Sequence, residues 1–372
     1  MTAIIAPPGL GKSTIGTTMA LSLASGRPLL GKPVHRGSQG VWIFNLEDGT
    51  DELERQLSAA IVFHGIEREE CADRLHLDSG LTQPLCTAME DRDGFTLAED
   101  VFQHLAGTIS ARNIATVIVD PFVSSHAVRE NSNEAIDAIA KRWKRLAQET
   151  GCAVVLVHRT KKLGGREATA EDGRGASALQ GAARVVLPLN GMSDKEAEEL
   201  GIGDPQLRRS LVRIDEGKVS RAPADVATWI KLESQSLQNG DGLEPSDHVG
   251  VATLWEKPDV FHGLTTWHLY TVQQRLAAGD WRESVQAKEW VGHLVASVAG
   301  LNAETDRGRI KALIRAWKAS GSLVVERRTD ANGDERPFVA VGKAVDPSEI
   351  GSRPHLQTCG AESAESAAGD PL

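Results

Sequence analysis

The most informative segment of this chain reads Ala6-Pro7-Pro8-Gly9-Leu10-Gly11-Lys12-Ser13-Thr14. An apolar run, residues 3–6, precedes it as a predicted strand, and residues 12–24 follow it with apolar side chains at helical spacing. A glycine-rich loop between a strand and a helix lets several backbone N–H groups point at one phosphate. The spacing is that of a phosphate-binding P-loop with alanine in place of its first glycine. The predicted nucleotide-binding residues are Pro8, Gly9, Leu10, Gly11, Lys12, Ser13 and Thr14.

Strands and helices alternate through residues 1–233, which predicts an α/β domain with a mainly parallel sheet. Three further apolar runs each end in a polar residue. They are residues 41–46 before Glu47, residues 116–119 before Asp120, and residues 153–157 before His158. Because the carboxyl ends of parallel strands meet at one edge of a sheet, we expect these side chains beside the P-loop.

At this edge we expect Lys12 to bind the β- and γ-phosphates of a nucleotide, and Ser13 with Asp120 to hold Mg²⁺. Glu47 is expected to orient or deprotonate the attacking water, and His158 to hydrogen-bond the γ-phosphate. Each of the three strand-end residues has a structural alternative. An acid there can belong to a turn or a helix cap, and a histidine can be part of the core.

The order of the motifs resembles that of the RecA-like ATPases, and most of all the plasmid RepA-type and DnaB-type replicative helicases and their phage relatives. The resemblance extends over residues 3–235. It rests on the P-loop and on four later motifs, NLED at 45–48, VIVD at 117–120, VHRTKK at 157–162 and GRGASALQGAARVV at 173–186. Relatives usually carry further residues ahead of the P-loop strand, which leaves a truncated chain open as an alternative.

The resemblance implies a RecA-like P-loop core that assembles into a hexameric ring and binds ATP with Mg²⁺ between subunits. It implies that Glu47 is the catalytic base, that Asp120 is the Walker-B acid and that His158 senses the γ-phosphate. Arg184 corresponds to an arginine finger that enters the site of a neighbouring subunit. Two weaker correspondences are Arg55, as a second basic contact, and Lys218, as a lysine that acts in trans.

Three functions compete. The first is an ATP-hydrolysing ring that acts on DNA as a helicase or replication motor of a plasmid or prophage. The second is an ATP-switched DNA-binding regulator or recombination-type ATPase that does not unwind DNA. The third, a small-molecule phosphotransferase, is disfavoured because it would need an arginine-bearing lid and an acceptor pocket, whereas this chain carries polar motifs at several strand ends.

The C-terminal part is expected to form a separate, mostly helical unit. Residues 234–249 are polar and rich in turn residues, which predicts a linker, and residues 250–343 predict three helices and a hairpin, as in a winged helix-turn-helix domain. Residues 344–372 predict a disordered tail. Residues 307–328 hold seven basic side chains and one acidic side chain, so Arg309, Lys311 and Arg315 are candidate DNA contacts. The alternative is a helical module that packs against a protein partner.

A second candidate DNA interface follows His158. The segment that begins with Arg159, Lys161 and Lys162 is rich in charge and glycine and predicts a mobile loop. In a ring, such loops could track a single strand through the central channel. The alternative is a charged loop without a ligand, because no aromatic side chain is present there to stack on a base.

Composition excludes several other classes of protein. The net charge of −10 argues against a protein that coats nucleic acid with its whole surface. The four cysteines are far apart, which supports neither a disulfide framework nor a zinc module. No apolar run is long enough to span a bilayer, and the N-terminus does not have the pattern of a signal peptide, so we expect a cytoplasmic protein without membrane contact.

Overall fold

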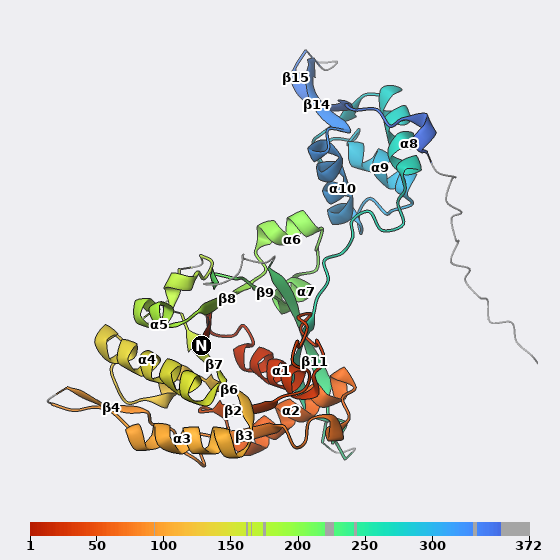
Figure 1. Cartoon of the computed structure of the whole chain (residues 1–372). Coiled ribbons are helices and arrows are strands. Elements are labelled where there is room, and N and C mark those ends of the chain that lie inside the picture. Colours follow the sequence, from red (N-terminus) through yellow and green to blue (C-terminus); the bar gives the residue numbers. More distant parts are fainter. Residues whose placement is uncertain are drawn as a thin grey trace, which may run out of the picture. The chain divides into compact units, whose positions relative to one another are not determined.

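The computed structural model describes residues 1–350 apart from 93, 161–162, 165, 174–175, 220–226, 242–243 and 330–332. The chain forms two compact units. The first contains Met1–Asp194 and Asp204–Lys257, and the second contains Lys195–Gly203 and the residues from Pro258 onward. Figure 1 follows the chain through both units.

The first unit is built on one large sheet, which has ten strands in the described part of the chain. Its six parallel strands lie side by side in the spatial order β8 (Val185–Gly191), β1 (Thr2–Ala6), β7 (Ala153–Arg159), β6 (Ile114–Asp120), β2 (Gly40–Asn45) and β3 (Leu75–Ser79). The P-loop strand β1 is therefore central. The strands that end at Asp120 and His158 lie next to one another on one side of β1.

Helices cover both faces of the parallel strands. The helices are α1 (Lys12–Ser25) and α2 (Thr50–His64) on one face, and α3 (Glu99–Ala111), α4 (Asn133–Thr150) and α5 (Ala176–Ala182) on the other. Alternate residues of β1 enter the two resulting cores, Ile5 on the side of α4 and Ile4 on the side of α1. Because both faces are buried, the central strands are continuous apolar runs. This is the α/β architecture predicted from the sequence.

Antiparallel strands extend the sheet beyond β8. They are β9 (Leu211–Ile214), β10 (Lys218–Val219), β11 (Thr228–Ser236) and β12 (His248–Leu254). The predicted linker 234–249 differs from what is observed. Its first and last residues pair with each other in β11 and β12, and Leu237–Asp247 connect the two strands. The polar composition that suggested a linker is that of a hairpin connection, and the first unit continues to Lys257.

The first unit also contains several short elements outside the large sheet. A hairpin of β4 (Ala88–Glu90) and β5 (Phe95–Leu97) is hydrogen-bonded to the segment that follows β6, since Thr87 donates to Ser125 O and Ala127 donates to Ala88 O. The remaining short helices of the first unit are Arg68–Glu70, Phe122–Ser125, Ala170–Asp172 and α7 (Pro205–Ser210).

The second unit consists of α8 (Thr266–Ala277), β13 (Trp281–Arg282), α9 (Val291–Ala299), α10 (Arg307–Ala319), β14 (Leu323–Thr329) and β15 (Glu335–Val341), together with most of α6 (Asp194–Leu200). Its strands pair in the order β13-β15-β14, so the β14–β15 hairpin forms a wing. Trp290 and Trp317 are buried between the helices. The element order and pairing match a winged helix-turn-helix.

The ends of the second unit bear on two further predictions. Residues 347–349 form a short 3₁₀ helix, and 351–372, most of the predicted tail, lie outside the described residues. None of the described helices is long and apolar enough to cross a membrane.

Candidate functional site

The P-loop connects β1 to α1 at the carboxyl edge of the sheet. Gly9 and Gly11 have φ angles of 80° and 65°, in the left-handed region that favours glycine. A side chain on Gly11 would also meet Leu232 of β11, 2.8 Å from the position of its Cβ. The first internal hydrogen bond of α1 runs from Ile15 N–H to Gly11 O, which leaves earlier N–H groups for a ligand. The loop thus has the backbone of an anion site.

Lys12 begins α1 and lies within the loop. Its Nζ donates to Pro7 O at 3.1 Å. Burial lowers the pKa of the Lys12 ammonium, although the carboxylates of Asp120 and Glu47 oppose this shift. A partly desolvated cation gains most from a bound anion such as a phosphate.

Asp120 ends β6 and is buried, with 7% of its surface exposed. Burial raises the pKa of its carboxyl, while a hydrogen bond from Ser13 and the charge of Lys12 lower it. Ser13 and Asp120 therefore lie in contact, although 107 positions separate them. A hydroxyl beside a carboxylate fits Mg²⁺, which takes one or two protein oxygens and completes its octahedron with phosphate and water. No cluster of three or more acidic, histidine or cysteine side chains is found among the described residues.

Glu47 follows β2 and is fixed by two sets of contacts. Its backbone N–H donates to Asn45 Oδ1 at 2.9 Å, and its two carboxylate oxygens accept from Arg159 Nη2 at 2.6 and 2.7 Å. Asp48 does not cap α2. The N-cap is Gly49, and Asp48 accepts from Asn45 Nδ2. Arg159, one of the predicted DNA contacts, is thus the ion-pair partner of the candidate base.

His158 is buried beside the P-loop strand, where it stands in register with Ile5. Its ring packs against Phe122, with ring centroids 5.8 Å apart. The Phe122 ring also contacts His126, with ring centroids 5.1 Å apart, and the sequence analysis did not single out this histidine. Burial lowers the pKa of His126 to about 4, and the nearby His158 adds to the shift. Two buried histidines therefore lie close together around Phe122, and only the strand-end position of His158 gave a signal in the sequence.

Arg184 lies at the opposite edge of the sheet. Its N–H donates to Met1 O, and the next residue, Val185, stands in register with Thr2. At about 3.3 Å per residue, the five residues of β1 separate Arg184 from the P-loop of its own chain by roughly 15 Å. Arg184 is exposed. The weaker candidate Lys218 donates to Gln180 O at 2.6 Å and is thereby tied to α5.

A polar cavity of about 380 Å³ adjoins Thr14, the last residue of the P-loop. It is lined by Thr14, Glu52, Arg55, Gln56 and Asp247–Gly250. The Arg55 guanidinium lies between two carboxylates, 3.6 Å from Glu52 and 3.5 Å from Asp247. Sequence reasoning missed this cavity because half of its wall comes from the hairpin β11–β12, which it had interpreted as a linker.

Side-chain contacts fix some of the described residues in the segment after Arg159, which was predicted to be a mobile loop. Arg166 forms an ion pair with the buried carboxylate of Asp172 and holds the pKa of that carboxyl far below its usual range. Ala168 N–H donates to Asn190 Oδ1 at 2.6 Å, which ties the segment to β8. The candidate DNA contacts Lys161 and Lys162 lie outside the described residues.

The basic residues of α10 are mostly engaged within the second unit. Arg309 donates to Val260 O at 3.1 Å, and Lys311 forms an ion pair with Glu198 of α6 at 3.2 Å. A Cβ on Gly308 would lie 2.4 Å from Gly201 O. The backbone of α10 therefore packs closely against the residue that follows α6, and both positions are glycines. Arg315 of α10 is exposed. No ion pair or side-chain hydrogen bond joins it to another of the described residues. Of the three predicted contacts, Arg315 is the one presented to solvent.

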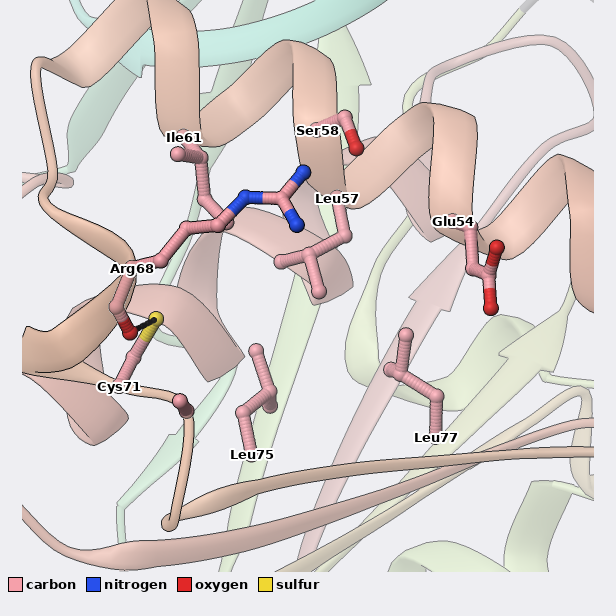
Figure 2. Close-up of a pocket in the computed structure, with 9 residues that line it drawn as sticks. Glu54, Leu57, Ser58, Ile61, Arg68, Cys71, Leu75 and Leu77 are labelled. Atoms are coloured by element: carbon pink, nitrogen blue, oxygen red, sulfur yellow. Dashed lines mark hydrogen bonds between the residues drawn. The ribbon is translucent and has the colours of Figure 1, made fainter.

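A groove of about 420 Å³ lies between α2 and β3, the last strand at one side of the sheet (Figure 2). Leu57 and Ile61 of α2 face Leu75 and Leu77 of the edge strand β3 across it. The Arg68 side chain extends toward Leu57 and Ser58, and Glu54 lies at one end of the groove. None of the residues singled out by sequence analysis lines this groove.

Comparison with known proteins bears on the fold of the first unit. Residues 1–165 match the model of a family described as an AAA domain. The matched segment includes the P-loop, Glu47, Asp120 and His158 and covers less than half of the chain. A solved structure titled "Crystal structure of the RadB recombinase" is 16% identical over 62% of this chain and 86% of that chain, with a TM-score of 0.40. The AAA-domain match and the observed sheet support the coarser part of the sequence prediction, a RecA-like P-loop ATPase fold.

Proposed function

We propose that this chain is a Mg²⁺-dependent ATPase that works on DNA. The observation that carries the proposal is the convergence of four groups at one sheet edge. Lys12, the Ser13–Asp120 pair and Glu47 come from three strand ends, and the charges of Asp120 and Glu47 both act on the Lys12 ammonium. A phosphate-binding loop, an oxygen pair suited to Mg²⁺ and a nearby carboxylate are the parts that hydrolysis of a nucleoside triphosphate needs.

Each residue then has a separate role. The P-loop N–H groups and Lys12 hold the β- and γ-phosphates, and Ser13 with Asp120 would hold Mg²⁺, which neutralises phosphate charge when bound. Glu47 accepts a proton from water as the water oxygen bonds to the γ-phosphorus and the bond from that phosphorus to the β–γ bridging oxygen breaks. His158 lies on β7, the strand next to the P-loop strand β1, and is the proposed contact of the γ-phosphate.

The polar cavity beside Thr14 is the proposed site of the nucleoside. Its acidic side chains Glu52 and Asp247 suit the hydroxyl groups of a ribose, because a carboxylate accepts hydrogen bonds from hydroxyls. Arg55 offers a planar cation to the face of a base. The hairpin β11–β12 would thereby contribute to nucleotide binding.

For the action on DNA, the leading proposal is a helicase or replication motor of a plasmid or prophage. A recombination-type ATPase or a DNA-binding regulator is the alternative. The winged-helix order of the second unit and the exposed Arg315 support DNA binding in both cases. A homo-oligomer, a hexamer in the leading version, is proposed because Arg184 lies too far from the P-loop of its own chain to act there.

The decisive experiment is ATP hydrolysis by the full chain, alone, with single-stranded DNA and with duplex DNA. Lys12→Ala is the blank. Lys141→Ala, which removes an equally charged side chain exposed on α4, is the matched control. Several-fold stimulation by single strands supports a motor and leads to a strand-displacement assay. Stimulation by duplex alone supports the regulator, and turnover that persists in Lys12→Ala contradicts the site.

A further inference from the structure

Arg159 and Glu47 form an ion pair that the nucleotide chemistry described above does not yet use. They are 112 positions apart in the chain, and the pair is formed by one nitrogen, Nη2, which donates to both carboxylate oxygens at 2.6 and 2.7 Å. Both side chains are about half exposed, at 45% and 46%. An exposed pair contributes little to stability, which makes a purely structural role a weak explanation.

The position of Arg159 places this contact in the nucleotide site. Its backbone stands in register with Ala6, the first residue of the P-loop motif. Its guanidinium lowers the pKa of the Lys12 ammonium through charge repulsion, which shows that the two cations are close. Since β6 lies between β7 and β2, the side chain of Arg159 spans the end of the Asp120 strand to reach Glu47.

A carboxylate that acts on water needs a fixed direction as well as a charge. An ionised carboxyl has about four lone-pair sites, and Arg159 occupies one on each oxygen, so acceptor sites remain for water. Without this contact, a half-exposed glutamate after the end of a strand would sample several rotamers. A displacement of about 1 Å in such a group can cost a hundredfold in rate.

We propose that Arg159 is a positioning residue for Glu47 that acts within its own subunit, and not a DNA contact. This inference rests on the proposed ATPase function. Arg159 holds the carboxylate of Glu47 toward the γ-phosphate side of the P-loop, so that the proton of the attacking water is taken up in one geometry.

The test compares three substitutions at residue 159 in the full chain, Arg159→Lys, Arg159→Gln and Arg159→Ala. One nitrogen makes both contacts, so a lysine ammonium can replace it, whereas glutamine keeps length without charge. We expect kcat for ATP to fall about tenfold to a hundredfold in the Gln and Ala variants, with KM little changed, and to recover substantially in Arg159→Lys. Arg145→Ala, an exposed arginine on α4, is the control.

A double-mutant cycle with Glu47→Gln separates positioning from the other roles. If Arg159 acts through Glu47, Arg159→Gln adds no further loss in the Glu47→Gln background. An equal loss in both backgrounds overturns the proposal, because Arg159 would then act on the fold or the phosphate directly. If Arg159→Gln has an unchanged kcat but binds a fluorescent single-stranded oligonucleotide more weakly, the proposal is also overturned. That result would support Arg159 as a DNA contact.

The same measurements distinguish this inference from the function on which it rests. If the wild type hydrolyses ATP and Glu47→Gln does not, while Arg159→Gln is as active as the wild type, only the positioning role fails. If the wild type hydrolyses no ATP above the Lys12→Ala blank, the proposed function fails and this inference with it.

Discussion

The carboxyl edge of the large sheet and the helix α10 both gather charged side chains, but in opposite ways. At the sheet edge, Lys12, Asp120 and Glu47 belong to distant parts of the chain and converge on one point, where charge or hydrogen bonds link each to the others. Along α10, cations close in sequence spread outward, and most find partners nearby, as Lys311 does in Glu198. Convergence between strands therefore indicates a site, whereas a charged helical stretch indicates only a surface.

The strongest test of this comparison is Lys12→Ala. The variant removes the cation that completes the P-loop, so we expect ATP hydrolysis to fall by at least about a hundredfold. Binding of a fluorescent ATP analogue, measured by anisotropy, should weaken as well. Lys141→Ala, which leaves the sheet edge intact, should behave as the wild type. If both variants hydrolyse ATP equally, the convergence at this edge is not a nucleotide site.

Arg184 tests whether the opposite edge of the sheet serves a neighbouring subunit. Arg184→Ala should still bind ATP, while hydrolysis by the assembled protein falls by about 10³-fold, as for other arginine fingers. Mixing Arg184→Ala with Lys12→Ala should restore part of the activity, since a mixed interface joins an intact P-loop to an intact arginine. The measurement is turnover against mixing ratio. No recovery at any ratio argues against action in trans.

The sequence sufficed for the parallel part of the fold and for the residues that end its strands. The P-loop, Asp120, Glu47 and His158 could be placed together because parallel strands bring their carboxyl ends to one edge. The hairpin β11–β12 escaped prediction because a polar turn and a linker have the same composition, and the cavity beside Thr14 was missed with it.

Side-chain pairing was the part that the sequence did not contain. Arg159 and Arg166 look alike as basic residues of a charged segment, yet one reaches Glu47 and the other Asp172. Glu47 is 112 positions from Arg159, so that pair depends on tertiary structure, whereas Asp172 is six positions from Arg166 and pairs through the local path of the chain. His126 was missed for a similar reason, because its environment depends on Phe122 and His158.

His126 extends the comparison to the interior behind the sheet edge. Its folded-state pKa of about 4 lies below the ordinary value of 6.5, so folding favours the neutral ring. The stability contributed by the neutral ring is therefore complete above pH 6.5 and is lost as the pH falls from 6.5 toward 4. At pH 5 this amounts to roughly 2 kcal/mol relative to pH 8.

The measurement is the free energy of urea unfolding at pH 8 and pH 5 for the wild type and for His126→Gln, which cannot titrate. We expect the wild type to lose more stability than the variant by about the amount above. Equal losses in the two proteins would mean that folding does not lower the pKa of His126, which would contradict the desolvation of its ring in the structure.

Arg315→Ala carries the smallest expected effect and tests the α10 side of the comparison. If Arg315 contacts a phosphate, its loss should weaken duplex binding regardless of DNA sequence and reduce the slope of log K against log salt by about 1. Arg275→Ala, the same charge change on α8, should leave that slope unchanged.

Arg309→Ala should act instead on the stability of the second unit, because Arg309 donates to the backbone of Val260. If Arg309→Ala changes the salt slope as much as Arg315→Ala does, Arg309 also contacts DNA. Bound DNA would then displace the contact between Arg309 and Val260, and α10 would present its full binding surface only in the complex.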